Sequence, residues 1–238
     1  MGKEQIKVEY IDHMGSDLST VNSARVSFDK QSDWQMVDRG VGSQYPMLFE
    51  RDEKLIKYLA KHKHMTPFRH NQIQIRCNAP IFLARQLGKH QAGLSWNEVS
   101  RRYVDSEPEF FVPDEWRGRP DGSIKQGSEG FVDEAEVYLF TDSSSGEAYS
   151  FRYIDIISAC DGWYLANKDK IAPEMARMVL PQSMMTSWYW TGNLISFAHV
   201  YKERIAEGAQ LEAQWFAEDL DKVIRPLFPE SWSALVDG

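Results

Sequence analysis

One stretch between positions 70 and 90 constrains the fold of this chain most strongly. Apolar and polar residues alternate over His70–Ala79, which predicts a half-buried β-strand. Pro80 follows directly, and proline suits the first turn of a helix because the amide hydrogen that it lacks would have no partner there. Apolar Ile81, Ala84 and Leu87 then recur at helical spacing. The sequence therefore predicts a strand that passes directly into a helix.

A polar segment, Lys89–Tyr103, follows this helix and reads KHQAGLSWNEVSRRY. It combines cationic, acidic, hydroxyl and carboxamide side chains within a short length of chain. Such a mixture suits a small anionic molecule with many hydrogen-bonding groups, such as a nucleotide. The alternative interpretation is a solvated turn whose charges are incidental, and composition alone does not separate the two.

The remaining periodic segments predict further helices and one more strand. We expect a strand at Ile6–Ile11 and helices at Asp17–Arg25, Asp52–His62, Tyr153–Ala166 and Gln210–Ile224, with Asp17 as a helix cap and Pro226 ending the last helix. Pro173 starts a helix that Pro181 ends. The segments Asp29–Tyr45 and Ser106–Gly130 are polar and aperiodic and are predicted to be loops.

The apolar run Ser183–Glu207 is predicted to be one mostly buried helix. Asn193 and Arg204 are eleven residues apart in it, so they would lie on nearly the same helix face, as an exposed seam or as a ligand-facing stripe. The run also carries more aromatic side chains than one small core needs. We therefore expect it to form a subunit interface through Trp188, Tyr189, Trp190 and Phe197.

Length and charge limit the class of protein. The chain has 238 residues with no shift in composition that marks a linker, so we expect a single domain over 1–238. A formal net charge of −8 argues against nucleic acid and membranes as partners, because their phosphates would be repelled. No signal peptide or long apolar run occurs. The two cysteines lie far apart in apolar surroundings, which favours buried thiols and a cytoplasmic location.

Several chemistries lack their motifs. His62, His64 and His70 are close in sequence, but cationic neighbours and the absence of a nearby Cys, Asp or Glu disfavour a metal, so we predict none. They are surface histidines or contacts for an organic ligand. No phosphate-binding P-loop and no dinucleotide glycine motif is present. Ser100 lacks the glycine-flanked elbow of a serine hydrolase, and Cys77 fits a core better than a nucleophile.

Six stretches, in order along the chain, resemble the flavin-dependent thymidylate synthases. The signature of that family, R-H-R followed after about seven residues by Ser, corresponds to the segment that begins at Lys89. The six stretches, which flank this signature, are Ser16–Ser27, His64–His70, Ala79–Gln86, Trp96–Tyr103, Ala176–Pro181 and Trp190–Asn193. Together they extend over most of the chain, which makes a chance match very unlikely.

The resemblance implies an enzyme that methylates dUMP to dTMP. The one-carbon unit would come from methylenetetrahydrofolate, the reducing equivalents from NADPH, and FAD would carry the hydride. It also implies an α/β (α+β) fold with a mixed sheet and flanking helices, and a homotetramer whose active sites lie between subunits. Residues matching the family's dUMP positions are Gln86, Glu98, Ser100, Arg102 and Arg177, with Ser100 and Arg177 in catalytic roles. Residues matching its FAD positions are Ser27, His64, Thr66, Lys89, His90, Gln91, Asn193 and Arg204.

The chain departs from the family pattern at several positions. The triplet R-H-R is Lys89-His90-Gln91, and the loop to Ser100 is one residue longer than the commonest form. Lysine keeps the charge of arginine but loses its two-pronged hydrogen bonding. Arg69 and His199 also differ from the usual residues, and insertions near 32–49 and 107–149 have no assigned role. Two alternatives stay open: another flavin- or nucleotide-binding enzyme on this scaffold, and a non-catalytic assembly protein that retains the fold.

Overall fold

The fold is built on a four-stranded sheet in the order β1 (Lys7–Met14), β4 (Gln72–Pro80), β10 (Met185–Asn193) and β5 (Leu94–Glu98). The structure is a computed structural model that describes residues 2–38, 40, 43–121, 127–140 and 148–238. Helices packed on this sheet confirm the expected α+β class. The three strand pairs of this sheet are antiparallel, so the expectation of a mixed sheet is wrong in that respect.

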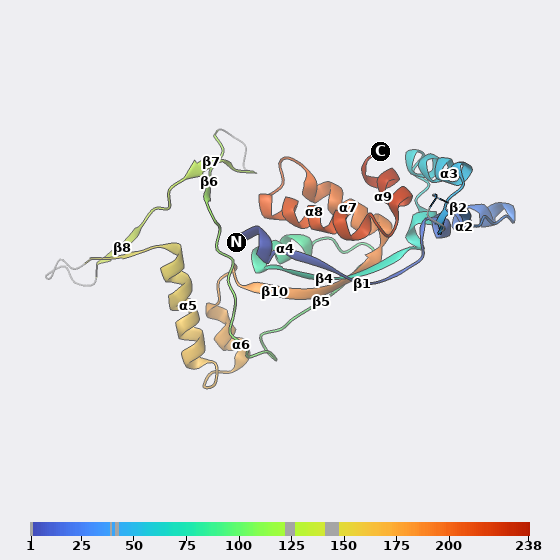
Figure 1. The fold of residues 1–238 in the computed structure, drawn as a ribbon. Helices are drawn as coiled ribbons and strands as arrows, with labels where there is room; N and C mark the ends of the chain where they lie inside the picture. Colours follow the sequence, from blue (N-terminus) through green and yellow to red (C-terminus); the bar gives the residue numbers. More distant parts are fainter. Residues whose placement is uncertain (1, 39, 41–42, 122–126, 141–147) are drawn as a thin grey trace.

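Helices cover one face of the sheet. Figure 1 shows α4 (Ile81–Leu87), α7 (Leu194–Ile205) and α8 (Leu211–Ile224) on the same side of the strands. Their apolar side chains share one core with the sheet, in which Ile75 and Trp190 of the strands join Leu83, Phe197 and Phe216 of the helices. All five side chains are fully buried, so this contact is the main source of hydrophobic stabilisation in the fold.

The other face of the sheet is polar because side chains alternate along each strand. Gln74 Nε2 donates to Thr191 Oγ1 at 3.0 Å, and Arg76 Nε donates to Ser187 Oγ at 3.2 Å, in both cases between β4 and β10. Tyr189 also points to this side and is 45% exposed. The alternation predicted for residues 70–79 is therefore confirmed, and β10 follows the same pattern.

The other elements surround the sheet or extend from it. The N-terminal part of the chain, up to β4, contributes helical elements and one hairpin besides β1. These are α1 (Gly2–Gln5), α2 (Asp17–Arg25), the 3₁₀ turn η1 (Val26–Phe28), the hairpin of β2 (Gln35–Asp38) and β3 (Gln44–Met47), α3 (Glu50–Lys61) and the 3₁₀ turn η2 (Thr66–Arg69). An arm that extends away from the sheet in Figure 1 contains β6 (Trp116–Gly118) with β7 (Glu129–Val132), β8 (Val137–Phe140) with β9 (Ala148–Phe151), and α5 (Tyr153–Asn167). The chain continues through α6 (Pro173–Ala176) and η3 (Arg177–Val179), and α9 (Pro229–Val236) ends it.

Most predicted helices and strands are confirmed, but the two segments predicted to be loops each contain short strands. The strand after Ile6 and the helices that begin near Asp17, Asp52, Tyr153 and Gln210 all form. The segment Asp29–Tyr45 contains β2 and the start of β3, and Ser106–Gly130 contains β6 and the start of β7. These short strands carry polar residues and glycine, so they lack the alternation that would have identified them.

The predicted helix Ser183–Glu207 is wrong in its first half. Met185–Asn193 is the strand β10, and the helix α7 begins only at Leu194. A short apolar run has no periodicity that separates a buried strand from a buried helix. Trp188, Trp190 and Phe197 are at most 1% exposed within this one chain, so they form the chain's own core and are not available for the predicted subunit interface.

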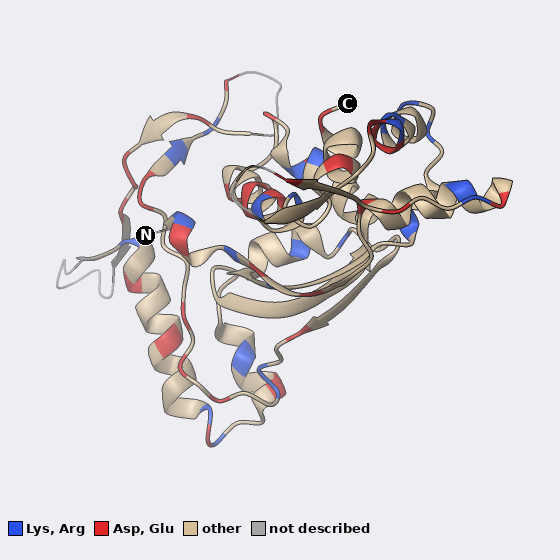
Figure 2. Cartoon of the chain, turned by 45° about the vertical axis from the view of Figure 1, so that its right-hand side comes forward, with Lys and Arg blue, Asp and Glu red and all other residues tan. Residues whose placement is uncertain are grey.

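The expectation of buried thiols is confirmed for one of the two cysteines. Cys77 is buried, Cys160 is half-buried, and both thiols are free. Acidic and basic residues are interspersed on the surface (Figure 2); on α3, for example, Lys54 Nζ lies 2.6 Å from Glu50 Oε1. Within the described ranges, no helix is both long and apolar enough to cross a membrane.

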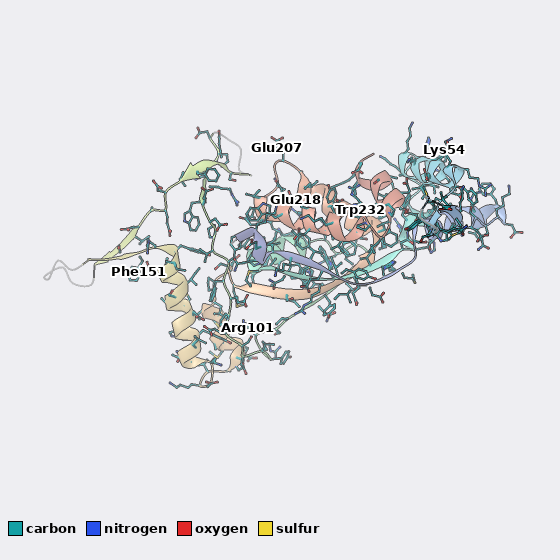
Figure 3. All side chains as sticks on the ribbon, viewed as in Figure 1. Lys54, Arg101, Phe151, Glu207, Glu218 and Trp232 are labelled. Atoms are coloured by element: carbon teal, nitrogen blue, oxygen red, sulfur yellow. The ribbon has the colours of Figure 1, made fainter. Side chains whose placement is uncertain are left out.

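Asp17 has a different role from the predicted helix cap. Ser16 is the N-cap residue of α2, and the carboxylate of Asp17 turns toward the C-terminal helix α9 instead. Its two oxygens accept hydrogen bonds from the backbone N–H groups of Glu230 and Ser231, at 2.9 and 2.8 Å, in the first turn of α9. Asp17 is 3% exposed, so it ties two distant segments together inside the protein. Nearby, Trp232 of α9 lies among the helices (Figure 3) and is fully buried.

We predict that Asp17→Ala lowers the free energy of unfolding by about 3 kcal/mol, because the N–H groups of Glu230 and Ser231, one partly and one fully buried, lose their carboxylate acceptor at the start of α9. Urea unfolding monitored by circular dichroism measures the change. Asp33→Ala removes an exposed carboxylate and serves as the control, with an expected change below about 0.5 kcal/mol. Equal effects of the two substitutions would contradict a special role for Asp17.

Candidate functional site

One group of predicted residues lines a cavity of about 340 Å³, here called the Ser100 cavity. Glu98 at the end of β5, Ser100 just after it, and Arg177 at the start of η3 all contribute to its wall. Arg101, which also lines it, lies beside α6 in Figure 3. The structure thus brings together three of the five predicted dUMP residues, from segments about eighty positions apart in the sequence.

The carboxylate of Glu98 is held in place from both sides. Thr186 Oγ1 of β10 donates to one of its oxygens at 2.8 Å, and the indole N–H of Trp96 donates to the other at 3.2 Å. Trp96 stacks on Trp188 with ring centroids 4.3 Å apart. Glu98 is therefore a fixed acceptor at the cavity wall. The sequence analysis did not identify Thr186 as a site residue. The one feature that could have pointed to it is that it is a polar residue inside an apolar run.

Arg102 lies next to the Ser100 cavity but is not part of its lining. Its guanidinium is 3.8 Å from the carboxylate of Glu174 on α6, and both side chains are at least half exposed. A pair this exposed contributes little to stability. Arg102 is therefore free to exchange its partner for another anion.

A second group of predicted residues lines a larger cavity of about 790 Å³, here called the Lys89 cavity. Gln86 near the end of α4, Lys89 just after it, and Arg204 near the end of α7 lie on its wall. The amide of Gln86 donates to Gln210 Oε1 at 2.6 Å. Gln86 therefore sits with predicted FAD residues and apart from Glu98, Ser100 and Arg177 of the same chain.

His90 and Arg204 form a contact that the sequence did not reveal. Nε2 of His90 accepts hydrogen bonds from Arg204 at 3.1 Å and 2.9 Å, from Nε and Nη2. The ring of His90 also meets that of His199 edge to face, with centroids 5.5 Å apart. Burial lowers the pKa of His90 to about 4, with further contributions from the cationic Arg204 and from His199. His90 is therefore neutral at physiological pH, with its proton on Nδ1.

The turn between α4 and β5 packs against the start of α7. Gly93 in this turn has a φ of +72°, and a side chain there would collide with Ser196 and Asn193. Asn193 is the N-cap residue of α7 and accepts from the N–H of Ser196 at 3.0 Å. It is therefore not on a helix face with Arg204, contrary to the prediction from their spacing. Gln91, in the same turn, is exposed.

The remaining predicted FAD residues lie on the N-terminal part of the chain. Ser27 is in η1, His64 lies just before η2, and Thr66 is the first residue of η2; all three are exposed. They line neither the Ser100 cavity nor the Lys89 cavity. One chain thus presents its predicted ligand residues on three separate surfaces. In the parts of the chain that the structure describes, no group of three or more His, Cys, Asp or Glu is arranged to hold a metal.

Known proteins match this chain along nearly its whole length. Residues 9–230 match the family described as thymidylate synthase complementing protein. A flavin-dependent thymidylate synthase of Thermus thermophilus is 33% identical over 228 residues, which is 95% of this chain and 74% of that protein. One from Thermosipho africanus is 32% identical over 231 residues, covering 95% and 89% of the two chains.

Solved structures give the same result. The crystal structure of the UMP/dUMP methylase PolB from Streptomyces cacaoi, bound with 5-Br dUMP, has a TM-score of 0.71 and 27% identity, covering 98% of this chain and 95% of that one. The same methylase bound with 5-Br UMP has a TM-score of 0.67. These matches extend over the sheet, both cavities and the N-terminal segments. The chain therefore belongs to the family of thymidylate synthase complementing proteins.

Proposed function

We propose that this protein is a flavin-dependent thymidylate synthase that converts dUMP to dTMP, with methylenetetrahydrofolate as carbon donor and NADPH as reductant. The observation that carries the proposal is the Ser100 cavity, where a fixed carboxylate, a hydroxyl and a guanidinium converge on a space suited to a nucleotide. Its relatives are named for this reaction, and a structural neighbour binds a dUMP analogue. The C5 hydrogen of uracil leaves as a proton, a one-carbon unit takes its place, and NADPH supplies the two electrons that reduce it to methyl.

The residues of the Ser100 cavity suit a pyrimidine nucleotide. Arg177 places a positive charge where electron density would build up on the uracil ring as C5 attacks the one-carbon unit, which lowers the barrier selectively. Ser100 and Glu98 offer a hydroxyl and a carboxylate that orient the nucleotide. Arg102, only loosely paired, is available for the phosphate, where a charged hydrogen bond contributes roughly 1.5–3 kcal/mol.

The Lys89 cavity fits part of a flavin nucleotide. Its wall combines the cations Lys89 and Arg204 with the carboxamides of Gln86 and Gln210, groups that bind phosphate or flavin carbonyl oxygens. His90 does not line this cavity, but it follows Lys89 directly and accepts hydrogen bonds from Arg204, and because it is neutral it adds no charge beside the wall. We assign FAD to this site and to Ser27, His64, Thr66, Gln91 and Asn193. When bound, FAD would supply two-electron transfer between NADPH and the one-carbon unit.

Exposed apolar side chains flank the predicted ligand residues, which supports a site shared between subunits. Val26 and Phe28, on either side of Ser27, are 69% and 76% exposed. Tyr103 and Met178, next to Arg102 and Arg177, are each 78% exposed. Large apolar groups at such positions are typical of protein interfaces. We infer that a second copy covers them and brings its Lys89 cavity to the Ser100 cavity of the first, within a homotetramer.

The proposed reaction is tested by release of tritium from [5-³H]dUMP and by formation of dTMP. Purified protein is expected to be yellow and to require dUMP, methylenetetrahydrofolate and NADPH together.

Cys77→Ser and Cys160→Ser should keep their turnover, because no cysteine nucleophile is needed and burial holds the pKa of the Cys77 thiol well above its ordinary value. A colourless protein that does not take up FAD would favour the assembly-protein alternative, and an inactive but folded cysteine variant would contradict the flavin-only route.

Mixing two inactive variants tests the shared site. Arg177→Ala damages the Ser100 cavity and Lys89→Ala damages the Lys89 cavity. If each active site combines one cavity from each of two subunits, assemblies containing both variants regain sites with two intact cavities, and dTMP formation returns. Co-expression of two differently tagged chains followed by tandem purification supplies such assemblies.

The matched control for this mixing experiment pairs Arg177→Ala with Ser100→Ala. Both changes lie in the same cavity, so no combination of subunits restores a complete site, and this mixture should stay inactive. If the Arg177→Ala and Lys89→Ala mixture is also inactive, the active site does not use cavities from two chains.

The low pKa of His90 gives a prediction that does not depend on activity. Arg204→Met should raise this pKa from about 4 toward the ordinary 6.5, but not fully, because burial remains the largest cause of the shift. The NMR signal of the His90 ring, followed against pH in wild type and variant, measures it. Arg152→Met, at the N-cap position just before α5, is the control and should leave the titration unchanged.

The same shift predicts how stability depends on pH. The pKa of His90 is lower in the folded chain than in the unfolded chain, so the unfolded state binds the proton more readily. The contribution of His90 to stability is therefore complete above about pH 6.5 and is lost as the pH falls toward 4. A wild-type His90 that titrates near 6.5 would contradict the buried contact with Arg204.

A further inference from the structure

A further cavity, of about 530 Å³, lies where the end of α3 meets α9, and it shares no wall residue with the Ser100 cavity or the Lys89 cavity. We call it the Lys63 cavity. Among the described residues, its wall contains no Asp or Glu but four lysines: Lys57, Lys61, Lys63 and Lys202. The chain as a whole has a formal net charge of −8, so this local concentration of positive charge needs a physical explanation.

Apolar side chains form most of the remaining wall. Ala60 and Met65 come from the end of α3 and the turn after it, and Ala234 and Leu235 come from α9. Figure 1 shows α3 and α9 side by side near the C-terminus, where the two helices pack together. An apolar wall lowers the local dielectric constant, which strengthens the attraction of nearby ammonium groups for an anion.

Most of the positive charge in this cavity has no counter-ion. Lys57 Nζ lies 3.6 Å from Glu230 Oε2, and this pair is partly exposed. The other three ammonium groups make no ion pair and no hydrogen bond with any residue that the structure describes. Lys57 and Lys61 are four residues apart on α3, an arrangement in which like charges repel each other. The cluster therefore costs stability unless an anion joins it.

The carboxylates at the C-terminal side do not neutralise the cluster. Gly238, the last residue of the sequence, also lines the cavity, but within the described part of the chain it makes no ion pair with any of the four lysines. Asp237, next to it, pairs with Arg225 at 2.8 Å. The pKa of Asp237 is lowered mainly by its hydrogen bonds from Arg225, and Lys202 is the smallest of the causes. An anion entering the cavity would therefore meet three unpaired lysines.

Lys63 occupies a backbone position that favours glycine. The N–H of His64 donates to the carbonyl of Leu59 at 2.8 Å, and the N–H of Lys63 donates to that of Ala60 at 3.0 Å. These two bonds form a Schellman motif, which ends a helix with one residue in the left-handed conformation. That residue is Lys63, with a φ of +57°. Glycine adopts this conformation readily, whereas a residue with a side chain does so at a steric cost.

The helix dipole accounts for two of the lysines but not for this one. Lys61 and Lys202 lie in the last turns of α3 and α7, where a cation is favourable. Lys63 lies beyond the end of α3, so the fold gains from neither its charge nor its conformation. A lysine kept at a position that opposes it points to a role outside folding.

We propose that the Lys63 cavity binds a condensed phosphate group, as found in inorganic pyrophosphate or in the phosphate tail of a nucleoside triphosphate. Lysine binds phosphate as a compact point charge, and several lysines around one space suit a compact group with several negative charges. The volume lies in the range of small-molecule sites. A nucleic acid is a poor candidate because the remaining surface of this acidic chain would repel it.

The Lys63 cavity is separate from the predicted FAD residues that are its neighbours in sequence. His64 and Thr66 flank Met65, but neither lines the cavity. The ring of His64 meets that of Tyr58 edge to face, with centroids 6.0 Å apart, and Tyr58 does not line the cavity either. The proposal therefore concerns a ligand other than the flavin, and it does not depend on the proposed reaction.

Calorimetric titration of the FAD-loaded protein, with dUMP present, tests the proposal through the dissociation constants of pyrophosphate and, separately, of ATP. Lys63→Gly should weaken binding about tenfold, because a charged contact is lost. The same substitution should raise the midpoint of thermal unfolding by about 2–4 °C, because glycine relieves the left-handed conformation. A variant that is more stable than wild type but binds less cannot owe its loss to misfolding. Lys61→Met and Lys202→Met should weaken binding to a similar degree.

The matched control is Lys54→Met, which removes the same charge from the same helix. Lys54, labelled in Figure 3, is 72% exposed, pairs with Glu50 at 2.6 Å and does not line the cavity. Its substitution should leave binding unchanged. An equal loss in this control overturns the proposal, because the lysines would then act only through the general charge of the surface.

The two ligands distinguish the sources of the phosphate group. Binding of pyrophosphate alone, dependent on the three cavity lysines, identifies a free condensed phosphate, and lysine-dependent binding of ATP identifies the tail of a nucleotide. A wild-type protein that binds neither ligand overturns the proposal, as does unchanged binding in all three cavity variants. Loss of FAD from Lys63→Gly during gel filtration also overturns it, because the cavity would then hold the diphosphate of the flavin.

Discussion

The structure depends on β4, which is hydrogen-bonded along both edges and runs directly into α4. Its partners are β1 on one side and β10 on the other, so it is an interior strand of the sheet. Pro80 ends the strand and serves as the N-cap residue of α4, which leaves no loop between them. The side chains that follow α4 are therefore placed at a fixed position relative to the sheet, and the chain must return along the far edge as β5.

Because β5 follows α4 along the edge of the sheet, the polar segment 89–103 contributes residues to two different cavities. Its first part, at Lys89, lies at the end of α4 and meets Arg204 of α7 around one cavity. Its last part, at Ser100, lies beyond the end of β5 and meets Arg177 around another. The strand β5 separates the two parts, so residues that are close in sequence face different spaces. The proposed site between subunits would join the two cavities across a pair of chains, and the exposed apolar residues beside Ser27, Arg102 and Arg177 support that proposal.

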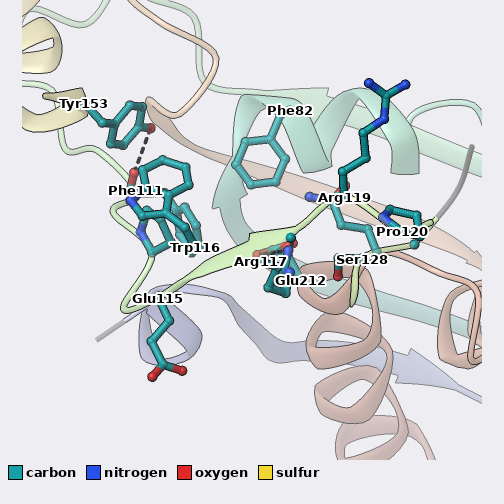
Figure 4. Close-up of a pocket in the computed structure, with 14 residues that line it drawn as sticks. Phe82, Phe111, Glu115, Trp116, Arg117, Arg119, Pro120, Ser128, Tyr153 and Glu212 are labelled. Carbon is teal, nitrogen blue, oxygen red and sulfur yellow. Dashed lines mark hydrogen bonds and ion pairs between the residues drawn. The ribbon is translucent and has the colours of Figure 1, made fainter. Parts of the chain in front are cut away.

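The insertion near residues 107–149 has a structural role that its composition did not indicate. Arg117 ties it to α8 through the buried carboxylate of Glu212, and Tyr153 ties its far end to Phe111. These contacts hold Trp116 on the wall of one cavity together with Phe82 of α4 (Figure 4), next to the Lys89 cavity, with which it shares Arg117 and Gln210. Aromatic residues in a glycine- and proline-rich stretch are thus the signal that sequence reading passed over, because no periodicity linked them to a core.

The sequence by itself determined the elements whose pattern is local and the family to which the chain belongs. The alternation in β4, the proline before α4 and the periodic faces of α3 and α8 depend only on neighbouring residues, and the motif residues could be matched one by one. The tertiary structure alone decided that Met185–Asn193 is a strand, because β4 and β5 offer it hydrogen bonds on both edges. It also decided that Asp17 binds the start of α9, that His90 accepts from Arg204, and that Gln86 and Ser100 line different cavities. The strand, the Asp17 contact and the His90 contact depend on residues about a hundred or more positions apart in the sequence. The separation of Gln86 from Ser100 depends on the strand β5, which lies between them. Neither kind of relation can be read from the local order of side chains.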